Sequence, residues 1–364
     1  MRQLAYPNGP RDIIEEGKEG MEGMEERAGT YSGSIFQYIC DRLEGGILPE
    51  GFSLPEENDG DIHWTDGALD GVIIYHMAEQ DLSEETMRLI QEGILAASEG
   101  NYQEADRIFL EIRKTIRAIQ IIDDLQRWII EHCESLNPSM IGQYGFHLLL
   151  EAQDRELVKI GLILMELLAE PDEGLKAVIE TLGLSDEFTI FAIFNMRKWE
   201  NGNEEIFRLA RKCRGWGRIH AVEYLDAEKE EDEGNQEIRD FLLREGYRNE
   251  IQNEYSALTC FEKAKVEERL RDVTLSENDF GHIGEILTAL LNEGPVQGIS
   301  ALENPERVLL LYVGQGKRLE EEGALLSDRD LASLRRVSDY AKDQSMSRVS
   351  DAAEELLSNR KAEG

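Results

Sequence analysis

A repeat with a period of 31 to 32 residues is the feature that most limits how this chain of 364 residues can fold. Three glycines, each followed by a large apolar residue, lie 32 and 31 positions apart: Gly183, Gly215 and Gly246. Each glycine follows a stretch with helical periodicity and precedes another one. A unit of this length holds a pair of short helices, whose apolar face can be buried only against neighbouring units. The repeat therefore predicts stacked helix pairs.

The ends of the repeat helices follow from the residues that commonly cap helices. We expect the first helix of each repeat to begin after an Asp or Asn, whose side chain accepts hydrogen bonds from the first free backbone N–H groups. We expect it to end at the glycine, in the left-handed conformation, with the next apolar residue packed on the last turn. The predicted helices are residues 175–182, 206–213 and 238–244, after Asp172, Asn203 and Asn235. The string Gly215–Trp216–Gly217 is then a junction between helices rather than a ligand loop.

Most other regions also show a helical pattern. Residues 1–30 are rich in Gly and Glu without a long apolar face, which predicts a loosely ordered arm. Residues 31–122 contain a helical hairpin around Gly100, residues 123–302 contain the repeats, and residues 303–364 form three helices that we expect to cap the end. The predicted fold class is all-α: an α-solenoid of stacked antiparallel helix pairs, with a helical N-terminal region and a C-terminal helical cap.

Two helical-repeat families resemble parts of the chain. The string from Gly100 to Ala105, with Ile108 and Phe109, is similar to the turn and second helix of a tetratricopeptide repeat. The period of the repeat, and helix starts such as Asp154–Lys159 and Asn235–Arg239, resemble HEAT repeats of the shorter variety, over roughly residues 124–302. Both resemblances imply an elongated concave surface that suits the binding of peptides or proteins.

One group of side chains could hold a metal ion. His63, Asp66 and Asp70 have the spacing i, i+3, i+7, which would place them on one face of a helix, and His76 follows in the same segment. Imidazole and carboxylate ligands suit a divalent cation. The alternative function is therefore a metal-dependent hydroxylase or hydrolase that uses these four residues. The ordinary interpretation is that Thr65 or Asp66 caps a helix and that His76 is a core histidine beside an apolar run.

A third resemblance bears on this alternative. Residues 67–77 and 215–225 resemble an uncharacterised bacterial family sometimes labelled limonene hydroxylase. Activation of oxygen would require a haem thiolate, a flavin site or an iron site built from histidine and carboxylate. Only the group around His63 could supply one of these. Otherwise no cofactor is expected.

The net charge limits the kinds of partner. The chain has 39 basic and 75 acidic residues, a formal charge of −36, which repels a phosphate backbone and favours a basic partner. Adaptation to high salt would produce a similar composition. The longest apolar run, from Ile160, is too short to cross a bilayer, and the four cysteines show no paired spacing. We expect a cytoplasmic protein that binds neither nucleic acid nor membrane; its oligomeric state is open.

Acidic residues are concentrated in residues 226–234, which contain six of them and one lysine. The ordinary interpretation is a solvated loop, and the functional one is an electrostatic landing site for a basic protein. The favoured function is thus a scaffold that binds a basic protein or peptide on the solenoid surface, rather than an enzyme. We expect Arg218 and His220 to be exposed in the first turn of a repeat helix. The candidate binding residues are Arg218, His220, Glu230, Glu231, Asp232, Glu233, Tyr247 and Arg248; none is assigned a catalytic role.

Overall fold

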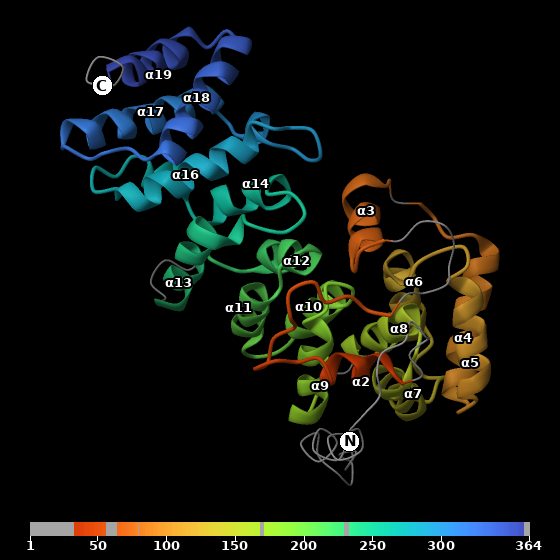
Figure 1. Ribbon diagram of the computed structural model, residues 1–364. Helices are drawn as coiled ribbons and strands as arrows, with labels where there is room; N and C mark the ends of the chain where they lie inside the picture. Colours follow the sequence, from red (N-terminus) through yellow and green to blue (C-terminus); the bar gives the residue numbers. More distant parts are fainter. Residues whose placement is uncertain (1–32, 56–63, 79, 168–170, 229–232, 360–364) are drawn as a thin grey trace. The chain divides into compact units, whose positions relative to one another are not determined.

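Helices form the regular secondary structure of the chain in the computed structural model (Figure 1), which describes residues 33–55, 64–78, 80–167, 171–228 and 233–359. No strand occurs within these ranges. The all-α prediction is therefore confirmed. The chain divides into two compact units, here called unit 1 (residues 1–217) and unit 2 (residues 218–364). The division falls near the start of α12 (Trp216–Tyr224), inside the predicted repeat region.

Unit 1 is built from helices of six to fifteen residues. They are α2 (Ile35–Cys40), α3 (Ala68–His76), α4 (Glu84–Ser98), α5 (Tyr102–Ile112), α6 (Ala118–Glu131), α7 (Pro138–Glu151), α8 (Arg155–Glu166), α9 (Glu173–Gly183), α10 (Thr189–Met196) and α11 (Gly202–Lys212).

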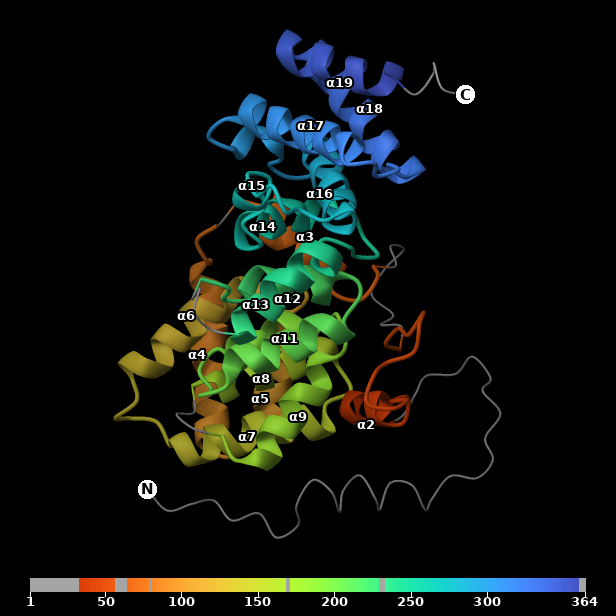
Figure 2. The same cartoon turned by 90° about the vertical axis from the view of Figure 1, so that its left-hand side faces the viewer.

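Unit 2 contains the remaining helices. They are α13 (Glu233–Phe241), the π-helical turn η1 (Leu242–Gly246), α14 (Glu254–Lys263), α15 (Val266–Arg269), α16 (Glu277–Leu290), the 3₁₀ turn η2 (Ile299–Ala301), α17 (Pro305–Glu321), α18 (Asp328–Asp343) and α19 (Ser347–Asn359). The three predicted C-terminal helices are α17, α18 and α19, which lie together in Figure 2.

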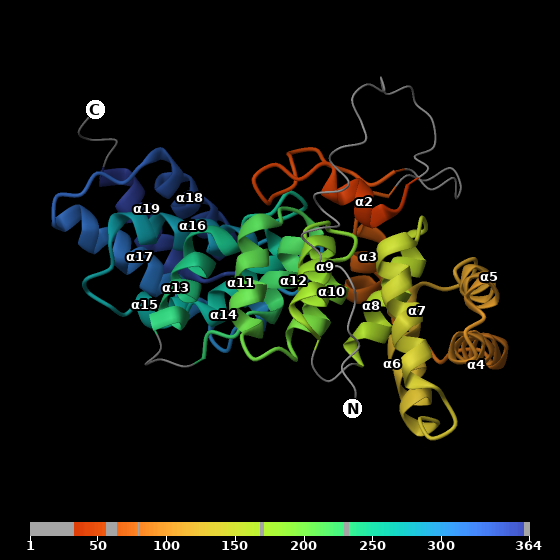
Figure 3. The same ribbon diagram turned by 90° about the horizontal axis from the view of Figure 1, so that it is seen from below.

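The helices pack in sequential pairs, as the repeat predicts. Neighbours such as α4 and α5, α7 and α8, and α9 and α10 lie against each other (Figure 3). Helices two places apart also touch: α4 contacts α6, α6 contacts α8 and α8 contacts α10 in unit 1, while α14, α16 and α18 form such a series in unit 2. Contacts of this kind stack one pair on the next, so each pair buries the apolar face of its neighbour.

The predicted capping role of the repeat glycines is wrong. Gly183 and Gly246 are the last residues of α9 and η1, and Gly215 lies between helices, but none of the three has a positive φ. Close packing explains the first two instead. A Cβ on Gly183 would lie 2.8 Å from the Cβ of Ala192, and one on Gly246 would lie 3.2 Å from the Sγ of Cys260. By contrast, Gly100 does adopt the left-handed conformation, with φ 80°, between the helices of the predicted hairpin.

Only one of the predicted N-caps is confirmed. Asp172 caps α9 and accepts a hydrogen bond from the backbone N–H of Leu175 at 2.9 Å. Asn203 and Asn235 lie inside α11 and α13, because these helices begin one turn or less earlier, at Gly202 and Glu233. The Trp216 side chain is 4% exposed. It covers α3 of unit 1, as described below, in addition to starting α12.

Candidate functional site

The segment with the predicted metal ligands packs on unit 1 through polar contacts. We call residues 64–77 the α3 segment. Gly67 precedes α3 with φ 74°, and its backbone N–H donates to the Glu187 carboxylate at 2.8 Å. The buried residues of α3 are Ala68, Asp70 and Gly71. The helix therefore fully buries no large apolar side chain of its own, and the contacts of Asp70 and Gly71 contribute to its position.

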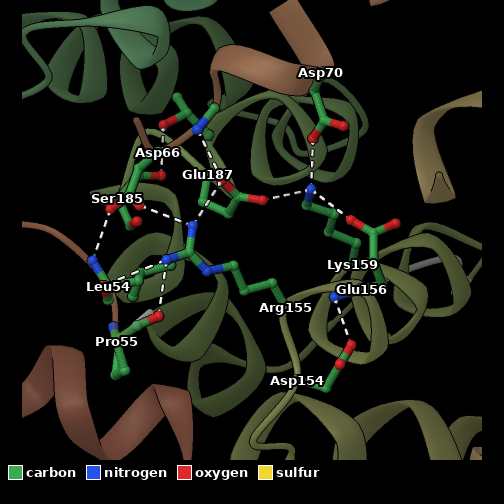
Figure 4. Close-up of polar contacts among 12 residues, drawn as sticks. Leu54, Pro55, Asp66, Asp70, Asp154, Arg155, Glu156, Lys159, Ser185 and Glu187 are labelled. Atoms are coloured by element: carbon green, nitrogen blue, oxygen red, sulfur yellow. Dashed lines mark hydrogen bonds and ion pairs between the residues drawn. The ribbon is translucent and has the colours of Figure 1, made fainter. Parts of the chain in front are cut away.

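Asp70 belongs to a cluster of charges centred on Lys159 (Figure 4). The Lys159 Nζ lies 2.7 Å from Asp70 Oδ2, 2.8 Å from Glu156 Oε1 and 2.6 Å from Glu187 Oε1. The lysine and Asp70 are each 2% exposed. One ammonium group thus sits among three carboxylates, from α3, from α8 and from the turn before α10.

A second set of polar contacts, next to the one around Lys159, is centred on Arg155, the first residue of α8. Its Nη1 lies 2.9 Å from Asp66 Oδ1 and 3.5 Å from Glu187 Oε2. Its Nη2 donates to the carbonyl oxygens of Leu54 at 3.3 Å and Pro55 at 2.9 Å. Glu187 joins the two groups. We call the six charged residues the buried ion cluster: Asp66, Asp70, Arg155, Glu156, Lys159 and Glu187.

Protonation in the buried ion cluster differs from one carboxyl to the next. Burial raises the pKa of Asp70 to about 7, although Lys159 acts in the opposite direction. Burial also opposes ionisation of Glu187, but Lys159 and Arg155 together lower its pKa to about 2. Burial opposes the charge of Lys159 as well, yet the three carboxylates raise its pKa above the ordinary value. Lys159 and Glu187 therefore stay charged at neutral pH, whereas Asp70 titrates there.

The cluster's carboxylates differ in how completely their oxygens are bonded. The second oxygen of Glu156 accepts the backbone N–H of Ala118 at 2.6 Å, and that of Glu187 accepts the N–H of Gly67. Asp70 Oδ1 has no hydrogen-bond partner. Because buried charges need complete compensation, Asp70 is the weakest point of the cluster.

The predicted metal ligands take other roles or lie outside the described residues. Asp66 and Asp70 each pair with a cation of the chain itself, Arg155 and Lys159. His76 ends α3 and is exposed, so it is not the core histidine of the alternative interpretation. His63 is outside the described residues. Within the described ranges no group of three or more His, Cys, Asp or Glu side chains is arranged to hold a metal ion.

Three of the predicted binding residues come together in unit 2. Arg218 donates from Nη1 to the backbone carbonyl of Arg248 at 3.2 Å. Arg248 is exposed, and its Nη2 lies 2.6 Å from Glu285 Oε2. Tyr247 is fully buried, and its hydroxyl donates to Glu285 and lies 3.2 Å from His282 Nδ1. Of these three, Arg248 is exposed, Arg218 is half-buried, and Tyr247 is buried with its hydroxyl on Glu285.

The expectation that His220 is exposed is wrong. Its side chain is 1% exposed, because it is on the inner side of α12 with Ile219 and Ala221. Burial lowers the pKa of His220 to about 4. The imidazole is therefore neutral in the folded protein near pH 7.

This burial predicts a pH dependence for unit 2. The folded pKa of His220 lies below its ordinary value of 6.5, so the unfolded chain takes up the proton first as pH falls. The stability that His220 contributes is present above pH 6.5 and is lost as pH falls through 4. We expect hydrogen exchange of the α12 amides, corrected for intrinsic rates, to accelerate between pH 6.5 and 4.5. His220→Gln, which cannot titrate there, should reduce this acceleration; an unchanged slope would contradict the assignment.

The acidic loop lies partly outside the described residues. Glu230, Glu231 and Asp232 are among the residues that are not described, and Glu233 begins α13. Asp226 and Glu228, at the start of the loop, are exposed. The loop as a binding site stays a prediction.

Lys159, at the centre of the buried ion cluster, has a role that the sequence analysis missed. The signal was a single lysine inside the apolar run 157–164, three residues after Glu156. A lysine in the middle of an apolar helix is almost never buried without a partner, so this spacing could have indicated an internal ion pair.

Comparisons with known proteins identify no relative: no protein-family model, no curated protein and no solved structure matches the chain. In the described part of the chain, no helix combines the length and the apolar character that a bilayer span requires.

Proposed function

We propose that the protein is an interaction module that binds a basic protein or peptide. The observation that supports this most is a group of exposed acidic residues where α12 ends: Glu223, Asp226 and Glu228. In the sequence the group continues through residues 230–233, which are all acidic. Such a concentration of one charge attracts a partner of the opposite charge and speeds its association.

One lysine of unit 2, Lys263, offsets part of this charge, but the acidic residues still outnumber it. Lys263 donates from Nζ to the backbone carbonyl oxygen of Leu225 at 2.8 Å and to that of Glu223. Burial lowers the pKa of Lys263, while the carboxylates of Glu223, Asp226 and Glu228 act to raise it. The lysine thus stabilises the C-terminal end of α12.

The stacked helix pairs support the finer form of this proposal. A HEAT-like solenoid over residues 123–302, preceded by a tetratricopeptide-like hairpin, would offer helix ends and loops at regular intervals to an extended partner. In this proposal the module works in the cytoplasm, and Arg218 and Arg248 add contacts to acidic side chains of the same partner.

A defined basic peptide tests the proposal. We would measure by fluorescence anisotropy the affinity of a labelled ten-residue arginine peptide for the full chain at low salt. In the loop variant the six acidic residues of 226–233 become Asn or Gln. We expect this variant to bind about tenfold more weakly, with a reduced dependence on salt.

The matched control carries the same change in net charge elsewhere on unit 2. It neutralises six exposed residues: Glu245, Glu303, Glu321, Asp339, Asp343 and Asp351. We expect its affinity to stay within about twofold of the unmodified chain, since only the local field at the loop is proposed to matter. If both variants lose affinity for the peptide equally, or neither loses any, the acidic loop is not the binding site.

A further inference from the structure

The buried ion cluster contains more negative than positive groups. Asp66, Asp70, Glu156 and Glu187 carry four carboxylates, whereas Arg155 and Lys159 carry two cations. With every group ionised, the cluster would hold two uncompensated negative charges in the interior, which is costly. Uptake of a proton by one carboxyl is the usual way in which a buried site reduces such an excess.

Geometry selects Asp70 as the carboxyl that takes the proton. Its Oδ1 lacks a hydrogen-bond partner, whereas both oxygens of Glu156 and Glu187 are bonded. The charged groups that act on it from the facing elements are Lys159 and Glu156 of α8 and Glu187 before α10. Two of these three are themselves negative, so they disfavour a charge on Asp70.

Asp70 is also a main attachment of the α3 segment. Ala68 and Gly71 are the other buried residues of α3, and neither has a large side chain. Three large apolar side chains of the segment, Trp64, Ile74 and Met77, are exposed. The large apolar side chains of α3 are at most half-buried, so polar contacts and Trp216 contribute much of what holds the segment.

We propose that packing of the α3 segment onto unit 1 is coupled to protonation of Asp70, so that the segment is held tightly in the protonated protein and loosens as pH rises through neutrality. When the segment detaches, Asp70 becomes solvated and its affinity for the proton returns to the ordinary value. The detached state exposes Lys159 and the Trp216 ring to solvent. Unit 1 therefore contains a conformational switch that responds to pH.

The direction of the pH dependence, and the pH range in which packing changes, follow from how tightly the packed and the detached segment bind the proton. The packed segment has Asp70 with a pKa of about 7 against an ordinary value of 3.8, so it binds the proton more tightly than the detached one. Packing is favoured progressively as pH falls from 7 towards 4 and is constant above about 8. Burial raises the pKa of Asp66 too, which acts in the same direction. Glu187 acts oppositely, but only below pH 4.5.

Hydrogen exchange on the full chain between pH 5 and 8 tests the coupling. The amides to follow are those of α3, such as Gly71, bonded to the Gly67 carbonyl, and Met77, bonded to that of Ile73. After correction for intrinsic exchange rates, we expect their protection to fall on the order of a hundredfold from pH 5 to pH 8. In Asp70→Asn, which mimics the protonated carboxyl, the fall should shrink to a few-fold.

Two comparisons make the test decisive. The amides of α8 should change much less than those of α3; an equal change would mean that unit 1 opens as a whole, and it would overturn the proposal. Protection of α3 that does not depend on pH in the unmodified protein would also overturn it, whatever the variant does. In the control variant Asp81→Asn, protection of the α3 amides should keep its full pH dependence, since Asp81 is exposed and lies outside the cluster.

Discussion

Replacing Lys159 with Met is expected to lower the free energy of unfolding of unit 1 by about 3–5 kcal/mol. The methionine keeps the aliphatic stem but removes the ammonium that compensates Asp70, Glu156 and Glu187 in the interior. For a unit of this size the loss corresponds to a fall in melting temperature of about 10 °C. Urea unfolding followed by circular dichroism, together with differential scanning calorimetry, would measure it.

A surface lysine supplies the control for this prediction. Lys176 pairs with Glu173 at 2.9 Å, but that glutamate is 91% exposed. Lys176→Met should therefore change the free energy of unfolding by less than about 0.5 kcal/mol. If Lys159→Met lowers the free energy of unfolding no more than Lys176→Met does, the ammonium group of Lys159 adds nothing to stability beyond the packing of its aliphatic stem.

Neutralising the carboxylates should reverse much of the loss. In the triple variant Lys159→Met, Asp70→Asn, Glu187→Gln, two of the three carboxylates that lost their partner are replaced with amides of similar shape. The amide oxygen introduced by Glu187→Gln can still accept the N–H of Gly67. We expect at least half of the lost stability to return, because removing both members of a buried pair costs much less than removing one. No recovery would show that Lys159 acts through packing alone.

The architecture could be predicted further than the roles of individual residues. A period of 31 to 32 residues, with two stretches of helical periodicity in each repeat, indicates helix pairs. The same pattern misassigned Gly183 and Gly246, because a glycine can serve a positive φ or a close contact equally well. Ala192 and Cys260, which make those contacts, are visible only once the helices are packed.

The buried ion cluster could not be predicted from local sequence patterns. Asp66 and Asp70 were considered as metal ligands, in the alternative function only, from their spacing along one helix face. Their actual partners, Arg155 and Lys159, are 89 residues away in the chain in both cases. Local spacing indicates which side chains share a face but carries no information about the element that covers it. Only the folded structure shows that the residues facing Asp66 and Asp70 are an arginine and a lysine.

Trp216→Ala is expected to destabilise unit 1 by about 3–5 kcal/mol, the range for removing a large buried aromatic side chain. The indole is 4% exposed and lies against α3, with its Cβ 3.1 Å from where a Cβ on Gly67 would stand, and its ring 6.0 Å from that of Tyr75. Removing it would leave a cavity beneath a helix that has no large buried side chain to fill it. Urea unfolding of the full chain would measure the loss.

A double-mutant cycle with Gly71 separates this contact from a general loss of packing. A Cβ on Gly71 would overlap the Trp216 ring, so Gly71→Ala alone should cost about 1–3 kcal/mol. With Trp216→Ala present the overlap is gone, and the same substitution should become neutral or stabilising by up to about 1 kcal/mol, because alanine favours a helix over glycine. Combined instead with Trp199→Ala, whose side chain is buried elsewhere in unit 1, its cost should simply add. Additivity in the Trp216 cycle would mean that the indole does not support α3, and the α3 segment would then depend on its other contacts, the buried ion cluster among them.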